Sequence, residues 1–165
     1  MDLSVVEGDI TEQRVDAVVN AANRRMRGGS GVDGAIHAAA GPGLLEECVQ
    51  RFPHGLPTGQ AGWTTGHRLA ARWVIHVVGP NHNAGETDRG LLVSCYRNAL
   101  AVADEVGAGS VAFPLVSAGV YGWPRQDAIA AAVDTLRETP TSVESAVLVA
   151  FGHRAYDEIA GYLGR

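Results

Sequence analysis

Short apolar runs alternate along the chain with longer segments whose apolar residues recur at helical spacing. Runs rich in valine, isoleucine and alanine predict strands, and apolar positions three or four residues apart predict amphipathic helices. The predicted strands are Leu3–Val6, Val15–Val19, Ala61–Thr65, Trp73–Val78, Ser110–Leu115 and Ala146–Phe151. The predicted helices are Val32–Ala40, Leu44–Arg51, Asp88–Val106, Gln126–Leu136 and Ala155–Leu163.

Strands that are apolar throughout and alternate with helices are typical of an α/β protein with a mostly parallel sheet covered on both faces. No linker, repeat or low-complexity tract interrupts the 165 residues, a length that forms a full core without disulfides. We therefore predict one domain over residues 1–165. In such folds ligands bind beyond the carboxyl ends of the strands.

The composition excludes several classes of chemistry. All 13 basic residues are arginine, which excludes lysine nucleophiles, Schiff bases and P-loop lysines. The net charge of −5 argues against bulk binding of nucleic acid, which requires a basic face. The six histidines lack metal-ligand spacing, so we expect no metal and no other cofactor.

Cysteine usage and hydropathy indicate where the protein works. Cys48 and Cys95 form no CxxC motif, and two cysteines suit a reducing compartment. No apolar run approaches the ~18 residues of a membrane span. We expect no secretory signal, because Met1–Ser4 has neither a basic n-region nor an apolar h-region. We expect a cytoplasmic protein that does not bind membranes.

A glycine-rich loop joins the second predicted strand to the first predicted helix. Asn20 and Asn23 follow the strand, glycines occupy positions 28, 29 and 31, and Asp33 lies at the helix start. Glycines let backbone N–H groups approach a phosphate, and a helix N-terminus favours an anion. Asparagine amides hold sugar hydroxyls, and the pKa of Asp33 beside a diphosphate would rise, making it a water-orienting base. The alternative is an ordinary glycine loop with a first-turn helix acid.

A second loop of small residues follows the strand that begins at Ser110. Its residues 117–122 offer exposed N–H groups that can hold another phosphate. Tyr121 and Trp123 could close over a sugar. The alternative is a structural turn whose aromatic side chains pack on the core.

A third motif, residues 8–11, follows the first predicted strand. The carboxylate of Asp9 and a neighbouring N–H can read the edge of an adenine. The alternative is an N-cap or an Asx turn.

Together these motifs resemble the macrodomain family, in particular its MacroD-type ADP-ribosylhydrolases. Six stretches match in the order of the family and cover nearly the whole chain. They are Gly8–Thr11, Val15–Asn23, Gly31–His37, Thr58–Ala61, Val74–Pro80 and Phe113–Gly122.

The resemblance implies a three-layer α/β/α sandwich around a central mixed, mostly parallel sheet, with ADP-ribose bound at the strand ends. By position, Asp9, Ile10 and Phe151 would contact the adenine, Asn23 the distal ribose, and Asp33 the attacking water. Asn20 lies in the same matching stretch as Asn23 and is a further ligand-binding candidate. The diphosphate would be held by Gly31, Val32, Ser117, Ala118, Gly119, Val120 and Tyr121.

The implied reaction is hydrolysis of the ester between ADP-ribose and a protein Asp or Glu, with Asp33 and Asn23 as catalytic residues. O-acetyl-ADP-ribose is a related substrate. The alternatives are a non-catalytic ADP-ribose-binding module and a phosphatase acting on ADP-ribose 1″-phosphate. The implied partners are ADP-ribose and ADP-ribosylated proteins, with nucleic acid only as an ADP-ribosylated end. We expect a monomer.

Two departures from the family pattern concern charge near the expected site. Arg24-Arg25-Met26-Arg27 replaces a small or apolar stretch, and this segment either attracts phosphate or an acidic protein substrate or is simply solvated. Gly152-His153 replaces a common aspartate after Phe151. His37, one helical turn after Asp33, could touch the site, but we expect it to be packed or solvated instead. We expect His76 to be a hydrogen-bonded core residue.

Overall fold

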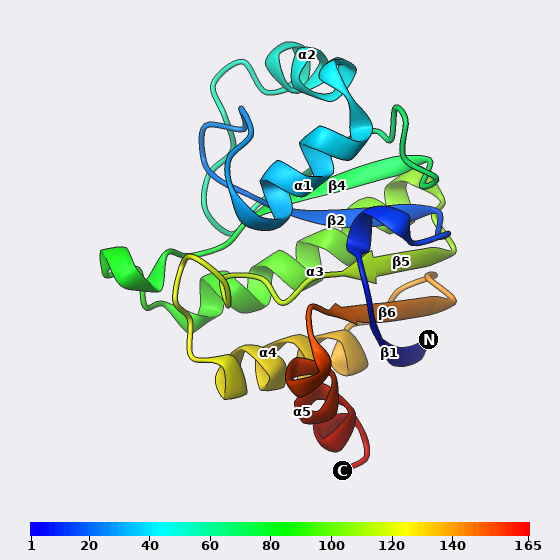
Figure 1. Cartoon of the computed structure of the whole chain (residues 1–165), viewed down its shortest axis with the longest axis vertical. Helices are drawn as coiled ribbons and strands as arrows, with labels where there is room; N and C mark the ends of the chain where they lie inside the picture. Colours follow the sequence, from blue (N-terminus) through cyan, green and yellow to red (C-terminus); the bar gives the residue numbers. More distant parts are fainter.

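A six-stranded sheet forms the middle of the molecule in a computed structural model that describes residues 1–165 (Figure 1). Its order is β1-β6-β5-β2-β4-β3. Neighbouring strands are parallel except for β3, which runs antiparallel to β4. The strands are β1 (Asp2–Glu7), β2 (Ala17–Ala22), β3 (Ala61–Thr65), β4 (Trp73–Val78), β5 (Ser110–Phe113) and β6 (Ser145–Ala150).

Five helices cover the two faces of this sheet. Helices α1 (Gly31–Ala40) and α2 (Pro42–Arg51) pack on one face. Helices α3 (Arg89–Val106), α4 (Arg125–Glu138) and α5 (His153–Leu163) pack on the other. Short 3-10 helices occupy Ile10–Glu12 and His82–Ala84. The predicted three-layer α/β/α sandwich with a mixed, mostly parallel sheet is confirmed.

Successive residues of the central strands face opposite layers, which explains why these strands are apolar throughout. Val18 packs with α1 and α2, whereas Val19 packs with α3 and α4. In β4, Val74 and Ile75 divide between the layers in the same way. Because both faces are covered, the strand pattern lacks polar alternation.

Each predicted strand and helix is present, with ends that shift by a few residues. The largest shift is in β2, which pairs with β4 as far as Ala22. Asn20 therefore lies inside the strand opposite His76, and the expectation that it follows the strand end is wrong. Buried partners satisfy its Nδ2, as described below, while its buried Oδ1 has no hydrogen-bond partner. Strand β5 ends at Phe113, before Pro114, which cannot donate to the ladder.

The parallel strands bring five loops to one edge of the sheet. Residues following β4 and β5 lie together there, at the left in Figure 1. Asn83 of the β4 loop donates from Nδ2 to the carbonyl of Val120 at 3.0 Å. The other loops at this edge follow β1, β2 and β6. No helix is both long enough and apolar enough to cross a bilayer.

Candidate functional site

The N-terminus of α1 presents backbone donors that the chain does not use. The N–H groups of Gly31, Val32 and Asp33 have no acceptor, and Ser30 makes no side-chain cap. Gly34 donates to the carbonyl of Ser30 at 3.3 Å, so the free groups belong to the first turn. An uncapped helix start of this kind favours an anion.

A second group of free donors lies in the loop after β5. The N–H groups of Gly119, Val120 and Tyr121 donate to no acceptor in the chain. The loop is fixed at its start by Ser117, whose φ of 64° lies in the left-handed region and whose carbonyl accepts from Trp123 at 2.9 Å. Successive free N–H groups in a turn can bind an anion.

The two aromatic residues of this loop have different environments. Trp123 belongs to the core cluster under the sheet and donates from Nε1 to Asp127 at 2.9 Å. The interpretation of Trp123 as a sugar cover is therefore wrong, because burial of the indole ring and its single hydrogen bond hold it in the core. Tyr121 is half-buried. Its pKa is raised, first by burial and then by the negative charges of Glu86 and Asp33.

The close approach of this loop to the end of β4 requires Gly79. A Cβ at this position would clash with Ser117 Oγ and would stand 2.6 Å from Val116 Cγ1. We expect Gly79→Ala to lower the free energy of unfolding by about 1–3 kcal/mol, the usual cost of overpacking. Urea denaturation measures the change. Gly119→Ala is the matched control, since a Cβ there meets nothing within 4 Å. Equal stability of the two variants would contradict the prediction.

Asp33 lies at the centre of a buried polar network. It is 4% exposed, and its Oδ1 accepts from Nδ2 of Asn20 at 2.8 Å. Nε2 of His37, one helical turn later, lies 3.5 Å from the same oxygen. His37 is therefore packed, but it also contacts the candidate acid, which the sequence analysis did not expect. Both partners hold Oδ1, and Oδ2 remains for another group.

Asn20 connects Asp33 to a histidine and a threonine below it. Its Nδ2 lies 3.1 Å from Nδ1 of His76, and Nε2 of His76 lies 3.0 Å from Oγ1 of Thr64. Burial, together with the charge of His37, lowers the pKa of His76 to about 3. The neutral ring therefore accepts from Asn20 at Nδ1 and donates to Thr64 at Nε2. The prediction of a hydrogen-bonded core histidine is confirmed.

Burial also determines the charge state of Asp33. Its pKa is raised by desolvation, against the opposing effects of the Asn20 hydrogen bond and the charge of His37. The rise exists without a bound diphosphate, so the fold itself makes this carboxylate more basic. A carboxylate with a raised pKa is better suited to accept a proton near neutral pH.

Asn23 and Asp33 converge at Gly29. A Cβ on Gly29 would stand 3.1 Å from Asp33 Oδ2 and 3.3 Å from Asn23 Nδ2. Asn23 also shapes the loop, because it donates to the carbonyl of Gly28 at 3.2 Å and accepts from the N–H of Arg25 at 3.1 Å. One N–H of its amide remains for a ligand.

Asp9 and Phe151 follow the ends of the neighbouring strands β1 and β6. Asp9 caps a 3-10 helix, since its Oδ1 accepts from the N–H and the hydroxyl of Thr11 at 2.9 and 2.7 Å. The predicted alternative of a capping turn is therefore present, and Oδ2 stays available. Phe151 is 95% exposed, while Ile10 is buried. A contact of these residues with adenine stays a prediction.

The predicted site residues thus fall on one edge, except that Asn20 is fully buried beneath Asp33. Sequence reasoning missed Thr64 and the contact between Asn20 and His76. The strand register Asn20↔His76 is the signal that could have revealed the contact, and it depends on knowing that β2 and β4 are neighbours.

Comparisons with known proteins identify the family. The model of the Macro domain matches residues 19–132. A Macro domain-containing protein of Streptomyces coelicolor is 54% identical over 98% of this chain and 98% of its own length. One of Streptomyces nogalater is 52% identical over 98% of this chain and 92% of its own. The chain belongs to the macrodomain family.

Solved structures match over the whole fold. The Oceanobacillus iheyensis macrodomain with ADP superposes with a TM-score of 0.90, at 39% identity over 97% of this chain and 88% of that one. The Trypanosoma brucei macrodomain in complex with ADP-ribose gives a TM-score of 0.89, at 38% identity over 98% of this chain and 69% of that one.

Proposed function

We propose that this protein binds ADP-ribose at the carboxyl edge of its sheet and hydrolyses the ester that joins ADP-ribose to a protein Asp or Glu. The observation that carries the proposal is the arrangement around Gly29, where Oδ2 of Asp33 and Nδ2 of Asn23 face one point. This point adjoins the free N–H groups at the start of α1. Two macrodomains of the same fold have been solved with related ligands, that of Oceanobacillus iheyensis with ADP and that of Trypanosoma brucei with ADP-ribose.

The strand order supports an extended path for the nucleotide. The adenine would lie between Asp9 and Phe151, at the ends of β1 and β6. The diphosphate would accept from the free N–H groups of residues 119–121 and 31–33, after β5 and β2. The distal ribose would then reach Asn23. Each part meets the chemistry that it requires: an aromatic face, amide donors and a side-chain amide.

In the proposed reaction a water attacks the anomeric carbon of the distal ribose. The bond from that carbon to the ester oxygen breaks, and the protein carboxylate leaves with the bonding electrons. The proton of the water passes to Oδ2 of Asp33, and ADP-ribose is released with a 1″-hydroxyl. Holding water and ribose at reacting distance is worth about 7–11 kcal/mol of the barrier in well-oriented systems.

Asn20 and His76 act in this proposal as positioning residues. Asn20 uses its N–H groups on Asp33 and on neutral His76, so the carboxylate cannot rotate freely. With Oδ1 occupied, Oδ2 is the proton acceptor. The raised pKa of Asp33, caused by burial, supports the role of a base.

The direct test is release of ADP-ribose from an auto-modified ADP-ribosyltransferase. We expect the wild-type protein to release it, and to deacetylate O-acetyl-ADP-ribose at the same site. The second candidate function is a non-catalytic ADP-ribose-binding module, which the free N–H groups alone would support. Calorimetry with ADP-ribose, read beside the release assay, distinguishes this module from a hydrolase. Tight binding with no release in any buffer would sink the hydrolase assignment. One domain over residues 1–165, a monomeric state and a cytoplasmic location stay predictions.

Gly29 offers a probe of the position of the water. We expect Gly29→Ala to lower kcat about 10–100-fold, because the methyl group occupies the point between Asp33 and Asn23. Calorimetry should show that ADP itself, which lacks the distal ribose, still binds. Gly161→Ala in α5 is the control, since a Cβ there has no neighbour within 4 Å. An unchanged kcat in Gly29→Ala would place the reacting water elsewhere.

A further inference from the structure

The arginine-rich segment 24–27 is held firmly against the chain. Met26 between the arginines is 2% exposed, adopts a φ of 58° and packs with Ala22 and Val78. The carbonyl of Arg24 accepts from the N–H of Leu56 at 2.9 Å. The buried side chain of Met26 and this backbone hydrogen bond, on either side of Arg25, fix the backbone of the segment. The side chains of Arg24 and Arg25 are exposed, as the solvated alternative predicts for them.

Arg27 is anchored without a carboxylate partner. Its guanidinium donates to the carbonyls of Met26, Cys48, Phe52 and Pro53 at 3.0–3.4 Å. Cys48 lies in the last turn of α2 and Phe52 caps it, and a helix C-terminus favours a cation. These contacts position the charge of Arg27 but leave it unneutralised.

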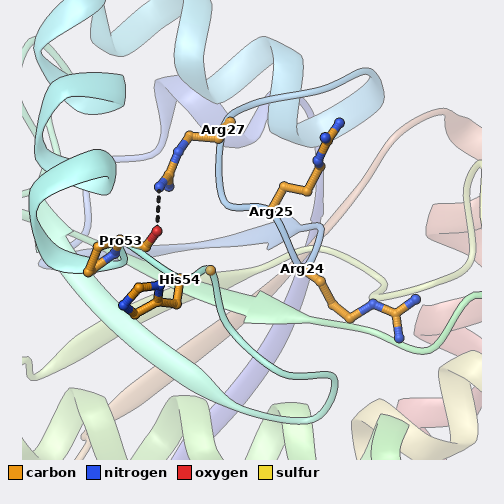
Figure 2. Close-up of a pocket in the computed structure, with 6 residues that line it drawn as sticks. Arg24, Arg25, Arg27, Pro53 and His54 are labelled. Atoms are coloured by element: carbon orange, nitrogen blue, oxygen red, sulfur yellow. Dashed lines mark hydrogen bonds between the residues drawn. The ribbon is translucent and has the colours of Figure 1, made fainter.

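The segment forms one wall of a basic hollow of about 490 Å³ (Figure 2). The lining residues are Arg24, Arg25, Arg27, Pro53, His54 and Gly55. No carboxylate is among them. The side chain of Arg24 is 66% exposed and pairs with Glu86 at 3.1 Å. The exposed side chain of Arg25 has no hydrogen bond or ion pair, and it is the free cation of the hollow.

The basic hollow adjoins the proposed catalytic point. Arg24 directly follows Asn23, and Arg27 is two residues from Gly29. The N–H of Arg25 donates to Oδ1 of Asn23 at 3.1 Å, which ties the two together. A polypeptide esterified to the distal ribose at Asn23 and Asp33 must leave the site past neighbouring surface, and this hollow is such a surface.

We propose that the basic hollow binds acidic side chains of the polypeptide that flank the ADP-ribosylated residue. The inference rests on the proposed function and names its substrate class: proteins modified within an acidic stretch. Guanidinium groups pair with carboxylates in a planar, two-bonded geometry. A nucleic-acid partner is disfavoured, because the net charge of −5 leaves no extended basic face.

Two peptides test the proposal, each carrying mono-ADP-ribose on one central Glu. One has Asp and Glu on both sides of it, and the other has Asn and Gln. The readout is the ratio of kcat/KM for the acidic peptide to that for the neutral peptide. We expect wild type to prefer the acidic peptide, and the preference to shrink as salt rises. Arg25→Gln and the double variant Arg24→Gln/Arg25→Gln should lower the ratio about two- to fivefold per arginine.

Arg97→Gln is the matched control, because Arg97 is exposed on α3, on the opposite face of the sheet. It makes the same charge change and should keep the wild-type ratio. The proposal is overturned if the wild-type ratio is near one. It is also overturned if Arg25→Gln has the same ratio as wild type. A third substrate, an oligonucleotide with an ADP-ribosylated terminal phosphate, tests whether the arginines favour nucleic acid instead. Arginine-dependent preference for that substrate alone also overturns it.

A binding measurement distinguishes failure of the hydrolase assignment from failure of the basic hollow as a docking site. If wild type cleaves neither peptide, fluorescence anisotropy gives the dissociation constant of each peptide, and the two constants are compared. Tighter binding of the acidic peptide, lost in Arg24→Gln/Arg25→Gln and kept in Arg97→Gln, then supports the basic hollow as a docking site of a non-catalytic module. Equal dissociation constants reject both proposals.

Discussion

Replacing Asp33 by Asn is expected to slow the release of ADP-ribose from a modified protein by about 10²–10⁴-fold, the usual contribution of a general base. Asparagine keeps the shape of the side chain and can still accept from Asn20 at the position of Oδ1. It cannot take a proton from water at the position of Oδ2. The loss should therefore fall on kcat, while calorimetry should find that ADP-ribose binding changes little.

A stability measurement on the same variant checks the physical cause. The pKa of Asp33 is raised because burial disfavours its charge, so the charged carboxylate costs folding free energy at neutral pH. Asp33→Asn removes the charge and should raise Tm at pH 7 while activity falls. Asp157→Asn on α5, with a side chain that is 62% exposed, is the control for both readouts. Wild-type hydrolysis rates in Asp33→Asn would remove Asp33 from the mechanism.

Acidification is expected to destabilise the fold through His76. Its pKa is about 3 in the folded protein, lowered mainly by burial, against 6.5 for a free histidine. Between these values the unfolded chain binds a proton that the folded chain does not. The free energy of unfolding therefore falls as pH drops from about 6.5 to 3, by up to about 1.4 kcal/mol per pH unit for one proton. Denaturation by urea across this range measures the slope.

His76→Gln isolates this contribution. Glutamine can supply one donor to Thr64 but does not titrate, so the variant should lose stability at pH 7 and show a shallower acid slope. The exposed His54→Gln is the matched control and should keep the wild-type slope. Asp33 acts in the opposite direction, since its raised pKa lets the folded state bind a proton above 3.8. An equal slope in His76→Gln and wild type would contradict the assignment.

The order of strands and helices was predictable because apolar residues pack against the helices on both faces of the sheet. Apolar runs such as Trp73–Val78 are buried on both faces in β4, and the prediction is confirmed there. The extension of β2 to Ala22 was not predictable from propensity, because Asn20 is a poor strand former. Pairing with β4 and buried hydrogen-bond partners outweigh that preference.

The candidate site shows the same division. The sequence indicates a glycine loop, free helix-start N–H groups and an acid at position 33 from local chemistry alone. It leaves open whether Trp123 covers a sugar or fills the core. In the structure Trp123 packs in the core cluster that includes residues of α3 and α4. It also leaves open whether the arginines at 24–27 are solvated. Backbone carbonyls anchor the side chain of Arg27, whereas the side chains of Arg24 and Arg25 are exposed.

The order of strands and helices, the absence of lysine chemistry and the residue types at the strand ends are properties of the sequence alone, because they depend on local periodicity and composition. The pairing of Asn20 with His76, the raised pKa of Asp33 and the basic hollow are decided by tertiary structure. Each arises from residues distant in the chain that share one low-dielectric or concave environment. Such an environment exists only after the sheet has assembled.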